Sequence, residues 1–476
     1  MSERIISFDI LRGWAIIGNL LVHTFMLVSQ VEGIAETDPG SLNTLGVILM
    51  AIIIVFGHWR GLFLMMSAAI HIYIMYRKFR NGVPRHVILV QELFKGFMLY
   101  LWAMFFYVFL AQWRLSKQWV ETGSSSIDWK QIYHTDQFTN IAFAIIVSAV
   151  VFYILTSNKK LQNPFVGTAI FATLGLLFIY LAPVIYNAAN TFWGVDFHSG
   201  GNLSVVGDKG WWGYIVSYFA NQAVSTESPL FTHYAYSAVG AIIGIFISRK
   251  HLKPKRFVRV GYGFSAFFMV FSIFHLWLEG DMPQNFDQFT ALVNFHVHPA
   301  WFVYLSTGMI LFVITLMLHL HEFNPKIDWF KRLMWSRHSR RVGVFSLTVY
   351  SLGSIQAVLR VSLSGIFNLF GWTDPGFRVS FGLPTGWTFF LIFLEIAMWF
   401  GILWLWEKGH FLYTVDWLFA MILKVPFMRK EKVRKYFIGD FLDVEGKVIA
   451  PTPILWWPSN TIDDKNAEKP QITETV

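Results

Sequence analysis

Three ionisable side chains stand within one apolar stretch near the start of the chain. The segment RIISFDILRGWAIIGNLLVH, from Arg4 to His23, contains Asp9, Arg12 and His23 among residues that suit a membrane-spanning helix. Insertion scales put the cost of a charged group at the centre of such a helix at roughly 2.5 to 3.5 kcal/mol. Charged groups in this position are therefore expected to belong to a functional site inside a helix bundle.

Arg12 and His23 are spaced to share one face of this helix. They are eleven residues apart, which is three helical turns and about 16 Å along the axis. An arginine stays charged and an imidazole titrates near neutral pH, so the pair could bind a long anion at one end and transfer a proton at the other. In the simpler interpretation Arg12 pairs with Asp9 and His23 is a hydrogen-bonded packing residue. Spacing alone leaves both interpretations open.

The composition is that of a polytopic membrane protein. Of 476 residues, 55% are hydrophobic and only 14% are charged, and apolar runs of about 20 residues recur along the chain. The absence of cysteine excludes disulfides, thiolate metal sites and an acyl-cysteine intermediate. The net charge of +9 is spread over many loops rather than one soluble face, so no nucleic-acid partner is expected.

The apolar runs predict an all-α transmembrane bundle of about ten spans, with a range of nine to eleven. We place the spans at residues 10–30, 45–76, 87–110, 138–156, 165–186, 230–248, 258–278, 300–320, 342–369 and 386–406. Alternate loops hold eighteen and five lysines and arginines, which is a strong positive-inside signal. This pattern predicts a multi-pass cell-membrane protein with both termini in the cytoplasm.

The sequence predicts one transmembrane domain over residues 1–427, followed by a cytoplasmic tail over 428–476 that is first basic and then polar. The polar run at 57–61 interrupts the second span and predicts a kinked or broken helix. An interfacial or re-entrant piece is expected at 211–219, where tryptophan and tyrosine are frequent. Residues 411–424 are expected to form an amphipathic helix on the inner face.

Other ionisable residues in the spans have mainly structural interpretations. Glu92 and Lys95 are expected to pair with each other, and Arg360 and Glu395 can pair across helices.

Further ionisable residues lie near the predicted outer face. His134 and Asp136 could contact an acceptor, although a helix-capping or solvated role is favoured. His275 begins a polar outer rim that continues with Glu279, Asp281, His296 and His298, but this spacing is weak evidence for a metal and none is expected.

Several fragments, in order along the chain, resemble segments of the YeiB-like membrane proteins. The first helix is similar to their R-I-x-x-L-D-x-L-R-G-x-A-L-L-G-I-L-L-V-N pattern, and WRGLFLMMSA at 59–68 is similar to F-R-x-L-F-S-x-L-F-G. The segments at 134–143, 340–356 and 409–418 resemble G-D-I-L, G-R-M-S-L-T-N-Y-L-x-Q-S and Y-G-P-L-E-W. The chain departs from the family at Ala68, Val349 and Arg360.

The resemblance implies a wider group of transmembrane acyltransferases. This group includes the acyltransferase-three family and heparan-alpha-glucosaminide N-acetyltransferase, one helix of which is similar to residues 231–244. YeiB-like proteins commonly have asparagine at the position of His23. The acyltransferase-three family instead has an arginine, ten residues and a histidine, which Arg12 and His23 reproduce.

The implied reaction is transfer of an acyl group from acyl-CoA, with acetyl-CoA as the expected donor, to a glycan or lipid-linked acceptor at the outer face. His23 is the expected general base, with His58 as a second candidate. Arg12 and Arg60 are expected to bind the anionic groups of the donor, and Asp9 to orient Arg12. The expected acceptor contacts are His134, Asp136 and His275. The bilayer is the expected environment, and the chain could act as a homodimer.

Three other functions stay open at this point. A transporter or flippase for an anionic solute would use buried charges along a pathway, with paired broken helices. A haem or quinone carrier could use His23, His58, His71 and His275. A purely structural membrane protein would have no need of buried Arg12, Arg60 and His23.

Overall fold

The described part of the chain folds into helices without any strand. The computed structural model describes residues 5–28, 60–110, 132, 135–193, 210–224, 228–249, 252–279, 299–324, 335–353, 355–370 and 385–424. The N-terminal half contains α1 (Ile6–Val28), α3 (Arg60–Arg80), α4 (Arg85–Phe105), η3 (Phe106–Leu110), α6 (Gln137–Leu155), α7 (Pro164–Trp193) and α8 (Gly210–Val224). The C-terminal half contains α9 (Leu230–Ile247), α10 (Pro254–Glu279), α12 (Ala300–Met317), η8 (Leu318–Glu322), α14 (Arg337–Val344), α15 (Ser346–Ser351), α16 (Ile355–Leu369), α17 (Thr385–Lys408) and α18 (Val415–Lys424).

Seven helical stretches among the described residues are long and apolar enough to cross a membrane: 85–110, 137–155, 164–192, 230–247, 254–279, 300–322 and 387–408. All seven coincide with predicted spans. The predicted spans at 10–30 and 45–76 overlap helices α1 and α3, which are not among the seven. Helices suit a membrane because they satisfy their own backbone hydrogen bonds.

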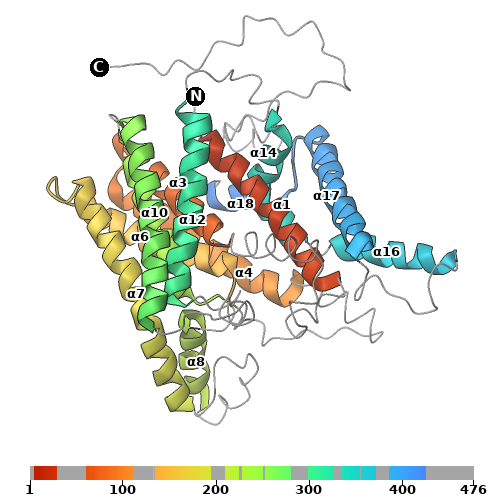
Figure 1. The fold of residues 1–476 in the computed structure, drawn as a ribbon, viewed down its shortest axis with the longest axis horizontal. Helices are drawn as coiled ribbons and strands as arrows, with labels where there is room; N and C mark the ends of the chain where they lie inside the picture. Colours follow the sequence, from red (N-terminus) through yellow and green to blue (C-terminus); the bar gives the residue numbers. More distant parts are fainter. Residues whose placement is uncertain are drawn as a thin grey trace, which may run out of the picture.

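The predicted span at 342–369 differs from the structure, which has three short helices here, α14, α15 and α16. The Asp416 carboxylate of α18 accepts hydrogen bonds from the Thr348 backbone N–H (3.0 Å) and hydroxyl (2.8 Å). It thereby satisfies an N–H group in the first turn of α15, where a helix has no acceptor of its own. In Figure 1, α16 lies nearly across the direction of α17.

The long helices pack as pairs of neighbours, and Figure 1 shows α10 and α12 running side by side. The most extensive contacts join α10 to α12, α3 to α9, α7 to α9, α4 to α6 and α1 to α14. Large apolar side chains on the outside of α10, such as Phe267 and Val270, are exposed. Such a surface suits contact with lipid. Helix α8 lies beside one end of α7 and exposes Trp211 and Trp212.

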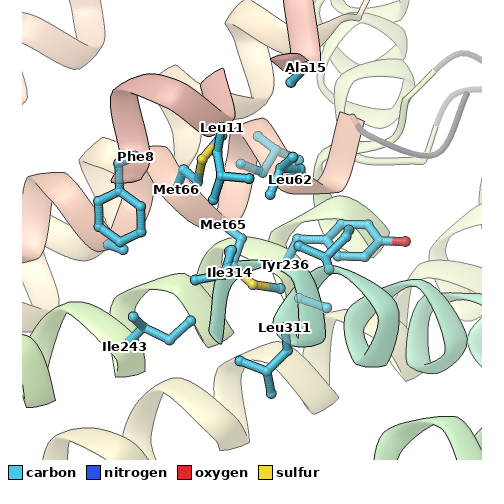
Figure 2. Close-up of a cluster of buried hydrophobic side chains, with 14 of the residues drawn as sticks. Phe8, Leu11, Ala15, Leu62, Met65, Met66, Tyr236, Ile243, Leu311 and Ile314 are labelled. Carbon is cyan, nitrogen blue, oxygen red and sulfur yellow. The ribbon is translucent and has the colours of Figure 1, made fainter. Parts of the chain in front are cut away.

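Glycines allow two of these helix pairs to approach closely. A methyl group added to Gly13 of α1 would overlap the Ser339 carbonyl of α14, and one added to Gly240 of α9 would overlap the Met65 carbonyl of α3. Small residues at such contacts are typical of helix packing in membranes. The main apolar cluster fills the space between α1, α3, α9 and α12, where Leu11 and Met66 lie (Figure 2).

The fragments that resemble YeiB-like proteins contact one another. The first, on α1, contacts the fourth where the Asp9 carbonyl meets Gly343 of α14. The third begins α6, where the Gln137 side chain donates to the Arg60 carbonyl at 3.0 Å. The last two meet where Asp416 binds Thr348. Segments far apart in the sequence therefore form one continuous part of the bundle.

Candidate functional site

A buried polar cluster lies where α3 and α6 begin and α4 ends. We call Arg60, Tyr107, Asp136, Ser228 and Tyr350 the Arg60 cluster. The Arg60 guanidinium donates to the Ser228 hydroxyl. Ser228 has a φ of 107°, a backbone conformation that is uncommon for any residue with a side chain. Strained residues of this kind are frequent at functional sites.

Asp136 has two roles in the Arg60 cluster. One carboxylate oxygen caps α6 by accepting from the backbone N–H groups of Phe138 (2.7 Å) and Thr139 (3.2 Å), which confirms the predicted capping role. The second oxygen lies 3.5 Å from the Tyr350 hydroxyl. Tyr107 also hydrogen-bonds to Asp136 and to Tyr350. The cluster thus aligns two phenols with a carboxylate beside a guanidinium, an arrangement that can bind and orient a polar substrate group.

The second cluster joins the C-terminal part of α1 to α16 and α17. We call Thr24, Arg360 and Glu395 the Glu395 cluster. Arg360 Nε donates to Glu395 at 2.6 Å, which confirms the predicted ion pair, and Arg360 Nη2 donates to the Thr24 hydroxyl at 3.2 Å. The Thr24 hydroxyl in turn donates to Glu395. All three side chains are buried, so this closed triad holds the backbone next to His23 in place. The His23 side chain itself is exposed.

The third cluster lies between α3 and α4, in the C-terminal half of α3. We call His71, Lys78, Glu92 and Lys95 the Glu92 cluster. The fully buried Glu92 carboxylate lies 2.6 Å from Lys95, which confirms the predicted pair. It also lies 3.1 Å from Lys78 and 3.3 Å from His71. The positive charges of Lys95 and Arg12 both act on His71, so Arg12 of α1 belongs to the surroundings of this cluster.

Arg12 also contacts α14. One of its guanidinium nitrogens lies 3.5 Å from the Gly343 carbonyl oxygen. Asp9, one turn earlier on α1, is buried where its backbone carbonyl meets Gly343. The role of Asp9 in orienting Arg12 stays a prediction. The α1–α14 contact nevertheless fixes the helix from which Arg12 extends.

The structure separates the residues that the sequence grouped into one site. Arg12 lies near the Glu92 cluster and Arg60 belongs to the Arg60 cluster with Asp136, whereas His23 follows α1 to the Glu395 cluster. His275 lies elsewhere, 3.1 Å from Glu279 and 3.2 Å from the Tyr180 hydroxyl. His58 and His134 lie outside the described residues, as do Asp281, His296 and His298.

Sequence reasoning missed the place of His71, which it named only as a possible haem ligand. A signal was present in the sequence. An arginine–glycine pair precedes His71 by the same number of residues as another arginine–glycine pair precedes His23. Each helix thus presents arginine, glycine, nine residues and histidine. Tyr107 and Tyr350 were missed without a comparable signal, because tyrosines in apolar spans are common packing residues.

A further ion cluster joins α14 to α17. Arg337 Nη2 lies 3.0 Å from Glu407, and Arg341 also pairs with this carboxylate. Partial burial, together with the positive charges of Arg341 and Arg337, lowers the pKa of the His338 imidazole. Arg337 and Arg341 supply the positive charge that meets Glu407 here.

No known protein-family model matches the chain, and no curated protein sequence matches it. The resemblance to YeiB-like proteins therefore stays a prediction from the residues quoted above.

Proposed function

We propose that the chain is an integral membrane acyltransferase. It would move an acyl group from acyl-CoA, with acetyl-CoA as the expected donor, to a hydroxyl or amine of a glycan or lipid-linked acceptor. This proposal rests on one observation about the fragments that resemble the acyltransferase group. They contact one another, and three of them supply Arg60, Asp136 and Tyr350 to the Arg60 cluster. This shared location supports the proposal, because the parts of one active site have to meet in the folded chain.

The proposed reaction is attack of the acceptor oxygen or nitrogen on the thioester carbonyl. His23 takes the proton of the acceptor as the new bond forms, the carbon–sulfur bond breaks, and the CoA thiolate leaves and is protonated. The proposal assigns the oxyanion that develops on the carbonyl oxygen to the Arg60 guanidinium, which requires His23 and the Arg60 cluster to face the same bound substrates. The exposed His23 side chain next to the buried Thr24 supports the role of base, because an accessible imidazole on a fixed backbone can meet an acceptor.

The two ends of α3 receive different roles in this proposal. Arg60 and His71 are eleven residues apart on α3, or about 16 Å. Basic side chains Arg77, Lys78 and Arg80 occupy the last turn of α3, which suits the cytoplasmic face by the positive-inside rule. The donor would enter at this end and the acceptor at the Arg60 end.

The test uses membranes that contain the protein, incubated with radiolabelled acetyl-CoA, with label followed into glycan and lipid fractions. His23→Ala should lower transfer by about 10²- to 10⁴-fold, the usual range for a general base. His319→Ala, which removes an exposed histidine on η8, should leave transfer unchanged. Full activity of His23→Ala would remove His23 from its role, and absence of transfer with several acyl-CoAs would reject the enzyme.

A transporter is the second candidate, and the broken segment α14–α15–α16 favours it. Interrupted helices with buried charges line pathways in many transporters. The same membranes distinguish the two, because a transporter would move labelled solute across the bilayer without changing it.

A further inference from the structure

The Glu92 cluster brings several basic groups to one carboxylate. Lys95 and Lys78 lie 2.6 Å and 3.1 Å from the two Glu92 oxygens, and His71 lies 3.3 Å from one of them. Glu92 is fully buried, whereas the side chains of Lys95, Lys78 and His71 remain 25%, 32% and 16% exposed. The carboxylate therefore holds both ammonium groups from the inside, and Lys78 also donates to the Gln91 side chain at 3.0 Å. The partial exposure of the two lysines leaves their outer sides accessible to a ligand.

The surroundings add positive charge. Arg12 acts on His71 from α1, and the last turn of α3 carries Arg77 and Arg80 beside Lys78. Lysine is a good ligand for phosphate because its ammonium presents a concentrated charge with three donors. Two lysines fixed by one carboxylate, with an arginine nearby, therefore suit a ligand with more than one phosphate group.

We propose that the Glu92 cluster binds the phosphate groups of the acyl donor, with Lys95 and Lys78 as direct ligands and Glu92 as the residue that positions them. The identification of the ligand as acyl-CoA rests on the proposed function. Two stretches of helix separate this site from the Arg60 cluster. Arg60 and His71 are about 16 Å apart along α3, and Lys95 and Tyr107 are about 18 Å apart along α4 and the start of η3. A donor with a long arm between its phosphates and its thioester can bridge such a distance. Arg60 consequently belongs to the acyl and acceptor end rather than to the phosphates.

The test measures equilibrium binding to purified full-length protein in detergent. The probes are CoA, pantetheine, which lacks the phosphates, and inorganic pyrophosphate. Lys95→Gln and Lys78→Gln should each weaken CoA and pyrophosphate binding by about tenfold or more, because each removes a charge-assisted hydrogen bond. Pantetheine binding should not change. Lys95→Arg, which keeps the charge, should retain most of the CoA affinity and controls for folding.

Lys160→Gln removes an exposed lysine between α6 and α7 and should leave CoA binding unchanged. If folded Lys95→Gln and Lys78→Gln proteins bind CoA as wild type does, the proposal is overturned even if acyl transfer is observed. If both variants lose pyrophosphate and CoA binding while the wild type transfers no acyl group, the phosphate site stands and the acyltransferase does not. If phosphatidic acid added to the micelles shows the lysine dependence and CoA does not, the cluster is a lipid site and the donor assignment is wrong.

Discussion

Glu92 and Glu395 are two buried carboxylates in the same bundle, but their surroundings differ. Glu395 accepts hydrogen bonds from Arg360 and from the Thr24 hydroxyl, and all three side chains are buried. Glu92 has two lysines and a histidine, all of them partly exposed. The first arrangement is closed and balances one charge with one charge. The second is open and rich in positive charge.

This difference separates a group that holds the fold from a group that prepares a binding site. Removing one member of a fully buried ion pair leaves a charge in an apolar environment, which is strongly destabilising. A partly exposed lysine can instead turn toward water or headgroups, as long basic side chains commonly do at membrane interfaces. Helix α1 connects the two regions, because it brings Thr24 to one and Arg12 close to the other.

The largest effect is expected from Glu395→Gln. This change removes the carboxylate that pairs with buried Arg360 and should lower the free energy of unfolding by about 3 to 5 kcal/mol. Thermal unfolding of the purified protein in detergent measures the loss. Glu92→Gln provides the contrast, and its loss should be less than half as large because the lysines can reach solvent. Equal losses in the two variants would contradict the distinction.

The contact that fixes α1 can be changed without touching either carboxylate. Gly13→Ala places a methyl group against the Ser339 carbonyl, so α1 must shift from α14 at a cost of about 1 to 3 kcal/mol. Since α1 carries Arg12, CoA affinity should fall together with stability. The matched control is Gly263→Ala on α10, where the added methyl meets no atom within 4 Å. A Gly13→Ala protein with wild-type stability would show that the helices are not held this closely.

A smaller effect is expected at Thr24. Thr24→Val keeps the shape of the side chain but removes the hydroxyl that bonds to Arg360 and Glu395, and should cost about 1.5 to 3 kcal/mol. Thr24→Ser restores the hydroxyl and should recover most of the loss. Denaturation midpoints of the three proteins measure this order. Failure of serine to improve on valine would show that the methyl group, rather than the hydroxyl, matters at this position.

The sequence predicted the helices well because apolar runs of membrane length carry a strong signal. Seven predicted spans coincide with apolar helices of membrane length, and the local pair Glu92–Lys95 was predicted from its three-residue spacing. The break at 342–369 was missed because the start of α15 is capped by Asp416, which lies far along the chain and binds Thr348 only in the folded protein. Hydropathy within a window contains no information on such a partner.

The sequence singled out Arg12, Arg60 and Asp136 as candidate site residues, but it missed Tyr107 and Tyr350 and did not predict which side chains lie together. Spacing placed Arg12 and His23 on one helix face, yet it could not show that the charge of Arg12 would act on His71 while the charges of Arg60 and Asp136 act on Tyr350. These neighbours come from α3, α4 and α6, and their relative positions depend on packing between helices. The repeated spacing of arginine, glycine and histidine on α1 and α3 was the one available hint of His71.

The central claim is that donor and acceptor use opposite ends of the bundle. Sealed membrane vesicles of both orientations, given radiolabelled acetyl-CoA only on the outside, test it directly. We predict transfer of label to glycan or lipid when the C-terminal end of α3, with its basic last turn, faces the added donor. In the reverse orientation we predict little transfer. Equal transfer in both orientations, with vesicles shown to be sealed, would contradict the account.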